Sequence, residues 1–497
     1  MTIGMLLNLI SVQNIASAYK NIQGALSAGP DEISWVLSSF LIAEVIMLPL
    51  SGWLMRALST RIFFTICAVG FSFMSILCGF AWNIESMIVF RVFQGFFGGG
   101  MMPAMFAVLF TLYPKKEQET VTILTGFIAT LASALGPPMG GYLSEIISWR
   151  WVFMGTSIPA MLVAIFVWLY GHFDSAEKKL FSKIDFTGIF LASITLGCGL
   201  WILEEGRRAD WFDSIYISSA TAVALITLTL FLIRSYTIKE SIVDLKIFSN
   251  RNFFIASLLV FTWGIVLFAP AYLLPIFLAQ IRGLDSQTIG MMVFIIGFCQ
   301  FLSGFLAWIF LKIMTRRAVA CIGFCLLGIG TWLQGHLFSG VGLEEILIPQ
   351  IIRGLAAQLC FLPIVNLSIG YLPESSIKNA SGLFSLMMRL GAAIGIAAAN
   401  TLVYSRTQVH YLSISEAVSG ASKAIYEFSI NSNALIGGIS SNSPQGIITK
   451  NTILSEIAYR ESAVIAYNEI TIWIAIFMLL LMPLTLCFKS ISKKRTG

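Results

Sequence analysis

Residues 87–113 read MIVFRVFQGFFGGGMMPAMFAVLFTLY and contain a single charged side chain, Arg91. Because about twenty apolar residues in a helix cross the hydrocarbon core of a bilayer, this stretch predicts a membrane-spanning helix. The whole chain has the same character, with 57% apolar and 11% charged residues among 497. A soluble domain has about 45–50% apolar and about 25% charged residues. These values exclude a soluble core and a disordered chain, and they predict an all-α polytopic membrane protein.

Working outward from this stretch, apolar runs bounded by charged, Gly, Pro or Asn residues predict fourteen spanning helices. They lie near 1–22, 33–55, 62–82, 87–113, 119–143, 151–170, 186–204, 215–234, 253–280, 286–311, 318–338, 346–372, 379–405 and 467–488. With the N-terminus inside, nineteen Lys and Arg residues fall in cytoplasmic segments and nine in outer ones. Basic residues concentrate on the cytoplasmic side, so both termini are expected there. The first span has no basic leader and is not a signal peptide; it is a short first helix, or the start lies upstream.

Weak internal repetition at an offset of about 250–260 residues divides the chain into halves. The matching features are Ser51-Gly52-Trp53-Leu54 with Ser303-Gly304-Phe305-Leu306, Arg91 with Arg353, and Gly136 and Gly140 with Gly391 and Gly395. We therefore predict a six-helix bundle at 1–170, a two-helix insert with its flanks at 171–250, and a second six-helix bundle at 251–488. Two such halves with a site between them are typical of rocking transporters.

Two segments lie outside the predicted spanning helices. Residues 406–466 are rich in Ser, Asn and Gly and are expected to form a long outer loop. This loop is either a tolerated excursion or a docking or lid element, because long loops without structure are uncommon unless functional or flexible. Residues 489–497 form a basic tail, which is expected in the cytoplasm.

Several motifs resemble one known family. They are Arg91-Val-Phe-Gln94-Gly95, Leu135-Gly136-Pro137-Pro138-Met139-Gly140-Gly141, Asp185 with Gly188, Gly206 with Asp210-Trp211, Arg353-Gly354, Arg389-Leu390-Gly391 and Ala466-Tyr467-Asn468-Glu469. Together they resemble the 14-span drug:proton antiporter branch of the major facilitator superfamily, the EmrB and QacA type. The resemblance implies the major facilitator fold and proton-coupled efflux of drugs or amphipathic compounds across the bacterial inner membrane. It also implies a small organic substrate and a periplasmic adaptor (membrane fusion) protein as partner.

Two positions depart from that family. The loop that follows the second span, Gly52–Arg61, has Arg56 where the family has an aspartate and Ser59 where it has a glycine. The first span has Ser11 where the branch carries the acid tied to proton coupling, with Gln13 and Asn14 nearby and no acid. Drug–proton exchange of the usual kind therefore needs another titrating group.

Four ionisable residues lie well inside the predicted spans: Glu44, Arg91, Arg353 and Arg389. A charge at the bilayer centre costs about 2.5–3.5 kcal/mol or more, which makes each a functional candidate. We expect Glu44 to carry the coupling proton with Arg91 as its electrostatic modulator; the alternative is a structural ion pair. The predicted substrate cavity contains Gln13, Asn14, Gln94, Arg353 and Arg389.

The motif in span 5 is predicted to serve movement. Gly136, Gly140 and Gly141 permit close helix approach, and Pro137 and Pro138 remove backbone hydrogen bonds, so the helix can bend where the halves rock. We expect this face of span 5 to pack against the other half, with packing without gating as the alternative. In the loop after span 2, Gly52, Arg56 and Arg61 are the expected motif residues.

Other functions are weighed against transport. The three histidines are scattered and no phosphate-binding loop is present, so we predict neither an enzyme nor an ATP-driven pump. The eight cysteines lie in apolar runs, so no disulfide framework or metal site is expected. The net charge of +6 is read loop by loop as a topology signal, so no nucleic-acid partner is expected, and no cofactor is predicted. The alternatives are a transporter of one organic anion or siderophore-like metabolite, in either direction, and a non-transporting receptor or scaffold. The excess of buried arginines favours the anion.

Overall fold

A computed structural model of the chain describes residues 1–29, 32–171, 173–177, 179–180, 184–238, 243–284, 286–420 and 444–488. These residues form helices and connecting segments and contain no strand. The predicted basic tail at 489–497 lies outside them. Thirteen helical segments of the described chain are long and apolar enough to cross a membrane. The first helix, which carries several amide side chains, is not among the thirteen, so the fourteenth span stays a prediction.

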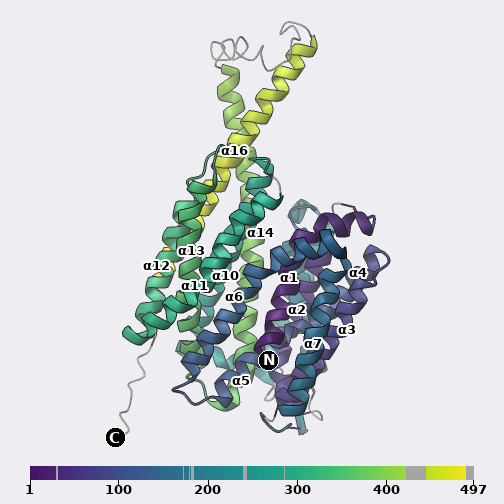
Figure 1. Ribbon diagram of the computed structural model, residues 1–497, viewed down its shortest axis with the longest axis vertical. Coiled ribbons are helices and arrows are strands. Elements are labelled where there is room, and N and C mark those ends of the chain that lie inside the picture. Colours follow the sequence, from purple (N-terminus) through teal and green to yellow (C-terminus); the bar gives the residue numbers. More distant parts are fainter. Residues whose placement is uncertain are drawn as a thin grey trace.

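The first half of the chain forms one bundle (Figure 1). Its helices are α1 (Thr2–Ala25), α2 (Trp35–Leu58), α3 (Thr60–Gly79), α4 (Ile84–Gly99), α5 (Met101–Leu112), α6 (Gln118–Tyr142) and α7 (Arg150–Tyr170). The stretch 87–113 is divided at Gly100 into α4 and α5, which together make one crossing segment. A capping box at Asn83, whose side chain accepts from the Ser86 amide, fixes where α4 begins.

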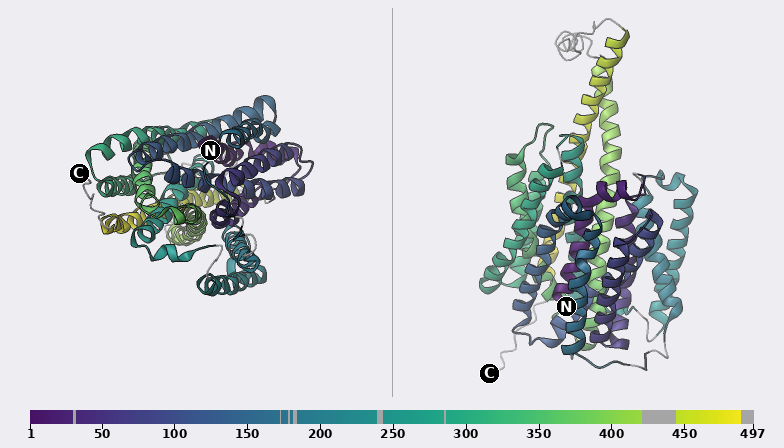
Figure 2. Two further views of the ribbon diagram at one scale, coloured as in Figure 1. Left: turned by 90° about the horizontal axis from the view of Figure 1, so that it is seen from below. Right: turned by 45° about the vertical axis from the view of Figure 1, so that its right-hand side comes forward.

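The last part of the chain forms a second bundle beside the first (Figure 1). Its helices are α10 (Arg251–Gln280), α11 (Ser286–Ile313), α12 (Arg316–Gln334), α13 (Leu343–Ser368), α14 (Glu374–Gly420) and α16 (Pro444–Leu481), with a short 3-10 turn at Met482–Cys487. Between the bundles in sequence, α8 (Phe186–Glu205) and α9 (Ile215–Thr237) pack on each other and stand apart as a pair (Figure 2). α8 also contacts α2 and α14, so this insert lies on the seam between the bundles.

The internal repeat is visible in the packing. In the first bundle α1 packs on α6, α2 on α4 and α3 on α7, and in the second α10 packs on α14, α11 on α13 and α12 on α16. The pairs correspond because α1, α2, α3, α4, α6 and α7 are repeated in the second bundle as α10, α11, α12, α13, α14 and α16. A Cβ on Gly140 of α6 would lie 2.2 Å from the Asn14 carbonyl oxygen of α1, and one on Gly391 of α14 would lie 2.1 Å from the Phe261 oxygen of α10. The repeat therefore reproduces the same close helix contact twice.

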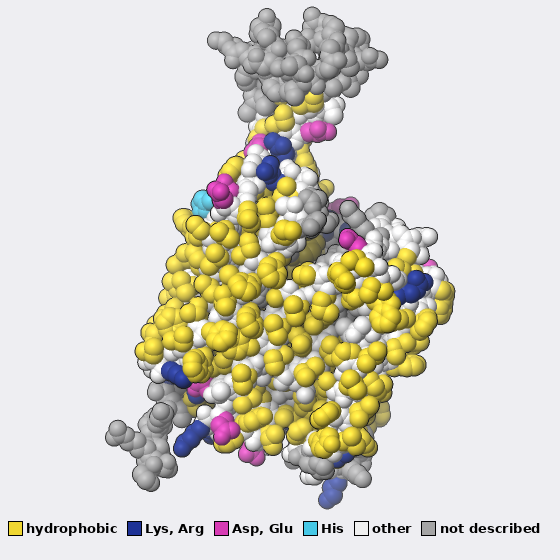
Figure 3. Space-filling view, in the orientation of Figure 1, with side chains coloured by type: hydrophobic (Ala, Val, Ile, Leu, Met, Phe, Trp, Pro, Cys, Tyr) yellow, Lys and Arg dark blue, Asp and Glu magenta, His cyan; other side chains and the backbone are white. Residues whose placement is uncertain are grey.

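The surface agrees with a membrane environment. Apolar side chains cover the broad middle of the molecule, and the charged side chains gather toward its two ends (Figure 3). Exposed aromatic and aliphatic residues such as Phe166, Tyr170 and Ile226 belong to this belt. Because such a surface would be unstable in water, it indicates contact with lipid.

The prediction that 406–466 forms a loop is wrong for the described residues. α14 continues to Gly420 and α16 begins at Pro444, and the two project beyond the bundles as a helical pair, here called the stalk (Figure 1). Residues 421–443 of the predicted loop lie outside the description. Arg406 of α14 donates to Glu469 of α16 at 2.6 and 2.9 Å, and the Tyr411 and Tyr459 rings meet edge to face at 6.3 Å. These contacts between helices outweigh a composition that is typical of loops.

The face of α6 that carries Gly136 and Gly140 packs on α1 of the same bundle, which corrects the expectation that it faces the other half. A Cβ on Gly136 would lie 2.5 Å from the Gln13 Cβ. The bundles meet instead through α2 with α14, and through α6 with α11 and α13, on a different face of α6. After Pro137 and Pro138, which lie inside α6, the chain changes to a π-helix over Leu143–Ser148. The motif therefore joins α1 to α6 and ends in an irregular turn.

We predict that Gly140→Leu destabilises the first bundle by about 1–3 kcal/mol, because the new side chain meets the α1 backbone, which cannot move aside as a side chain can. The measurement is thermal unfolding of the purified protein in detergent. Gly199→Leu is the matched control, since a Cβ at Gly199 in α8 has no neighbour within 4 Å. Equal melting temperatures for the two variants would contradict the close packing of α6 on α1.

Candidate functional site

Glu44 lies near the middle of α2 and is only 2% exposed. Its Oε1 atom accepts hydrogen bonds from Asn8 Nδ2 of α1 at 3.0 Å and from Arg389 Nη2 of α14 at 2.8 Å. Its other oxygen, Oε2, has no hydrogen-bond partner among the described residues. Because α2 lies on the seam, the Glu44–Arg389 ion pair joins the first bundle to the second inside the membrane region.

Arg91 does not pair with Glu44. Its guanidinium is fully buried and donates to the Val36 carbonyl at 2.8 Å and to Gln94 Oε1 at 2.6 Å, and it lies 4.1 Å from the centre of the Phe40 ring. Ser11, which occupies the place of the acid that the family carries, is 3.4 Å from the Arg91 Nη1 atom. The predicted site residues Arg91 and Gln94 therefore form a closed polar cluster within the first bundle.

Arg353 occupies the equivalent environment in the second bundle. It is fully buried, donates to Gln334 Oε1, and lies 3.3 Å from the carbonyl oxygens of Val266 and Leu267 in α10. Gln334 in turn donates to the Tyr467 hydroxyl at 2.6 Å. A carbonyl cage of this kind compensates a buried cation without an acid. Arg91 and Arg353 are thus enclosed by their own bundles, whereas Arg389 reaches across the seam.

Gln13 and Asn14 are held by the α6 motif. Their part of α1 faces Gly136 and Gly140, and the Asn14 amide, turned to donate, lies 2.6 Å from the Gly136 carbonyl oxygen. Asn14 is 1% exposed, so it is a packing residue, and Gln13 is half-buried. Among the motif residues, Gly140 is buried and Pro138 is exposed.

At the end opposite the stalk, one carboxylate links the two bundles. Asp174, in the segment after α7, accepts from the Thr60 amide at 2.9 Å and from the Thr60 hydroxyl at 3.0 Å, and also from Lys378 Nζ at the start of α14. Lys378 Nζ donates to the Met55 carbonyl at 3.2 Å as well. We call this set the Asp174 bridge. It places an acid beside a loop motif that has Arg56 in the position of the usual aspartate.

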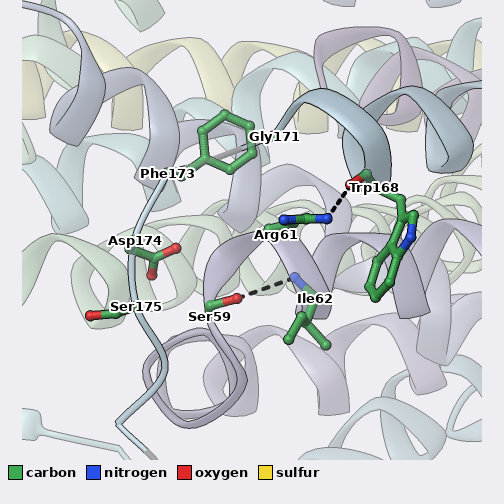
Figure 4. A pocket seen from close by; sticks show the side chains of 8 residues that line it. All are labelled: Ser59, Arg61, Ile62, Trp168, Gly171, Phe173, Asp174 and Ser175. Carbon is green, nitrogen blue, oxygen red and sulfur yellow. Dashed lines mark hydrogen bonds between the residues drawn. The ribbon is translucent and has the colours of Figure 1, made fainter.

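The residues of the predicted loop motif surround this bridge. A Cβ on Gly52 would lie 2.6 Å from Asn379 Cα of α14, so glycine permits the two bundles to touch here. Arg61 donates to the Trp168 carbonyl, and its guanidinium lies 4.9 Å from the Trp168 ring centre. Figure 4 shows Arg61, Trp168 and Asp174 around a pocket at this end. The Arg56 carbonyl accepts from the Glu177 amide at 3.0 Å.

Further contacts close the same end. Arg316 of α12 pairs with Glu119 of α6 at 2.6 Å, and the Phe106 ring of α5 meets Phe384 of α14 edge to face at 6.2 Å. Together with the Asp174 bridge, they hold the bundles together at the end opposite the stalk. An alternating-access carrier in this state would expose its centre toward the stalk side.

Sequence reasoning identified Glu44 and Arg389 but not their contact, and it missed Asn8, Asp174 and Lys378. No helical periodicity marks Asp174, because it lies between helices. Among the described residues, no group of three His, Cys, Asp or Glu side chains is placed to hold a metal ion. The arrangement offers charge pairs that join the two bundles across the seam.

Comparison with known proteins agrees with this geometry. The sequence model described as the Major Facilitator Superfamily matches residues 1–409. The colistin resistance protein EmrB of Acinetobacter baumannii is 32% identical over 98% of this chain and 94% of its own length. The multidrug export protein EmrB of Escherichia coli K12 is 26% identical over 81% and 78%. The crystal structure of the human organic anion transporter MFSD10 matches with a TM-score of 0.62 and 13% identity, covering 97% of each chain.

The structural likeness shows the fold, and the sequence match places the chain in the family. The fold, with two repeated bundles that meet at a seam, leads to the same family as the sequence match over most of the chain. The chain belongs to the Major Facilitator Superfamily and is a multi-pass membrane transporter, not an enzyme.

Proposed function

We propose that this protein exports drugs or other amphipathic organic compounds across the bacterial inner membrane in exchange for protons. The observation that carries the proposal is the Glu44–Arg389 ion pair between the bundles. The names of two relatives, for colistin resistance and for multidrug export, support the substrate class. The alternative substrate, an organic anion or siderophore-like metabolite, loses its main argument, because Arg91 and Arg353 are enclosed and Arg389 is paired.

Coupling follows from the chemistry of the pair. Arginine keeps its proton throughout, so only Glu44 can change charge. An ionised Glu44 attracts Arg389 across the seam and favours the state in which the two helices touch. Separating the ionised pair is costly, because it leaves uncompensated charges in the membrane region. Protonation of Glu44 removes the attraction and therefore lowers the free-energy cost of separating the bundles. A proton arriving at Glu44 would therefore favour opening at the end opposite the stalk.

Substrate and proton would then alternate. In the state described, the Asp174 bridge closes one end, and export requires this end to open so that substrate enters from the cytoplasm. A proton would bind to Glu44 from the stalk side. Its release on the opposite side would restore the Glu44–Arg389 ion pair. Each ligand shifts the equilibrium only by its difference in affinity for the two states.

We propose that both termini lie in the cytoplasm and that the stalk lies outside, as the distribution of basic residues indicates. A periplasmic adaptor protein would then meet the stalk, which projects from the membrane region as a paired helical surface.

The central test replaces Glu44. Glu44→Gln keeps the size of the side chain and a hydrogen-bond acceptor for Arg389 but cannot titrate. We expect it to abolish export driven by an imposed pH gradient in inverted vesicles while downhill exchange continues. Glu469→Gln is the matched control, because Glu469 pairs with Arg406 and His410 within the stalk helices. Wild-type accumulation by Glu44→Gln would show that protons couple elsewhere.

A second prediction concerns the Asp174 bridge. Asp174→Asn weakens the link to Lys378, and an ion pair of this exposure is worth up to about 1 kcal/mol, so the open population at this end should rise about fivefold. The readout is the maleimide labelling rate of Ser51→Cys, a fully buried position on the seam. Glu177→Gln, on the same segment but exposed, is the control and should leave the rate unchanged. An unchanged labelling rate in Asp174→Asn would mean that the Asp174 bridge does not help to close this end.

The proposed orientation has its own test. A cysteine at Glu456, exposed on the stalk, should react with an impermeant maleimide added to whole spheroplasts, and a cysteine at Lys115, exposed between α5 and α6, should react only in inverted vesicles. The reverse pattern would overturn the topology.

A further inference from the structure

Asn8 of α1 holds the Glu44 carboxylate from inside the first bundle. Its Nδ2 atom donates to Glu44 Oε1 at 3.0 Å, and the Asn8 side chain is 1% exposed. The other donor to the same oxygen, Arg389, belongs to the second bundle. When the bundles separate, Arg389 leaves with α14, whereas Asn8 stays beside Glu44 because α1 and α2 belong to one bundle. Asn8 is therefore the polar neighbour that Glu44 keeps in both states.

Two glycines of α4 bring these side chains together. A Cβ on Gly98 would lie 2.1 Å from Asn8 Oδ1, and a Cβ on Gly99 would lie 2.6 Å from the backbone carbonyl oxygen of Glu44. Glycine at both positions lets α1 and α2 approach the same turn of α4. The glycine run that follows Gln94 in the sequence thus places an amide beside an acid inside the membrane region.

Two buried oxygen atoms of this pair lack a hydrogen-bond donor. Glu44 Oε2 and Asn8 Oδ1 are both enclosed, and neither has a partner among the described residues. A buried acceptor that is left without a donor is costly. Because the two oxygens belong to side chains that are already joined by one hydrogen bond, they point to a shared donor that the ionised state lacks.

The charged side chains on the helices around α2 do not provide this donor. Arg389 of α14 contacts Oε1 of Glu44. Arg91 of α4 donates to the Val36 carbonyl and to Gln94. Glu204 of α8 accepts from Ser38, which lies more than one turn from Glu44 along α2. The donor that remains is the proton that Glu44 itself takes up.

A neutral carboxylic acid and a primary amide are complementary, because each offers one donor and one acceptor along the same edge. A hydroxyl formed at Oε2 can donate to Asn8 Oδ1 while Asn8 Nδ2 continues to donate to Oε1, which closes a ring of two hydrogen bonds. The outermost torsions of Glu and Asn side chains have broad minima, so they can turn to close the ring at little cost. One proton thereby satisfies both oxygen atoms.

We propose that Asn8 is the positioning residue for the coupling proton, and that an acid–amide ring between Glu44 and Asn8 replaces the Glu44–Arg389 ion pair when the bundles separate. The proton comes from water on the stalk side, bonds to Oε2 and returns to water on the opposite side, while Arg389 keeps its own proton throughout. The inference rests on the proposed function and deepens it, because it names the group that stabilises the neutral acid after Arg389 has left.

Infrared difference spectra between acidic and alkaline pH test the ring in the purified full-length protein in liposomes. The carboxylic acid C=O band that is absent from Glu44→Gln belongs to Glu44. Asn8→Leu keeps the shape of the side chain but has neither donor nor acceptor, so we expect this band to move to higher wavenumber. Asn366→Leu is the matched control, because Asn366 is also buried but donates to the Leu362 carbonyl of α13; it should leave the band in place.

Two further measurements leave Asn8 unsubstituted. In wild-type protein that carries isotope-labelled asparagine, an amide C=O band should move to lower wavenumber on acidification, because Asn8 Oδ1 accepts the new hydrogen bond; in Glu44→Gln it should not move. Gly98→Ala displaces Asn8 Oδ1 with its new Cβ and should shift the Glu44 band in the same direction as Asn8→Leu.

Transport supplies a functional readout. We expect Asn8→Leu to reduce pH-driven accumulation in inverted vesicles about tenfold while downhill exchange continues, because the neutral acid loses its partner and the protein keeps its shape. An equal loss of accumulation and exchange would mean that Asn8 only packs α1 on its neighbours and would overturn the proposal. An unchanged Glu44 band in Asn8→Leu, or an asparagine band that does not respond to Glu44, would overturn it as well.

These outcomes are distinguishable from failure of the proposed function. The spectra need neither substrate nor gradient, so full accumulation by Glu44→Gln would refute coupling through Glu44 and leave the spectral test of the ring intact. Conversely, loss of coupled export in Glu44→Gln with full accumulation and an unshifted band in Asn8→Leu would refute the ring and leave the proposed function standing.

Discussion

A charge inside a bilayer needs a partner, and this constraint organises the interior of the protein. Among the residues that the structure describes, Arg91, Arg353, Arg389 and Glu44 are buried deep in the membrane region, and they are compensated in two ways. Arg91 and Arg353 are surrounded by amide side chains and backbone carbonyls of their own bundles. Only Glu44 and Arg389 depend on each other across the seam. The fold thus encloses two of these cations within single bundles and leaves one pair that spans the seam.

The repeat explains why the two bundles are rigid while the seam is not. Each bundle is fastened by a glycine contact: Gly140 of α6 lies against α1, and Gly391 of α14 lies against α10, and at both positions a larger residue would meet backbone. Between the bundles a glycine approach of this kind, Gly52 on Asn379, stands beside contacts of another kind: ion pairs such as Arg316–Glu119, aromatic pairs and the Asp174 bridge. Polar contacts of this sort can be exchanged for water at modest cost, whereas interlocked backbones cannot. Rocking without loss of bundle structure follows from that difference.

Much of this could be predicted from sequence, because bilayer thickness and apolar composition fix helix positions. The predicted ranges for α6, α7 and α8 agree with the structure to within a residue or two, and the depth of Glu44 was evident from its distance to the span ends. Its partner was not, since the rotation of α2 and α14 decides which arginine it meets. The glycines of α6 indicated a close approach but not to which helix. Residues 406–420 were misjudged because their polar composition hid a helix stabilised by Glu469, far away in the chain.

The stalk has a mechanical consequence. α14 is a single helix of 47 residues, so it is about 70 Å long, and it carries Arg389 near its lower third and the stalk at its far end. A stiff rod magnifies rotation: about a pivot at Arg389, roughly 46 Å from Gly420 along the helix, a tilt of about ten degrees moves the tip by about 8 Å. The helix is therefore a lever, with the ion pair close to its fulcrum and its longer arm reaching to the stalk. Each breaking and reforming of one salt bridge would then be accompanied at the tip by a displacement of about 8 Å, close to the diameter of a helix.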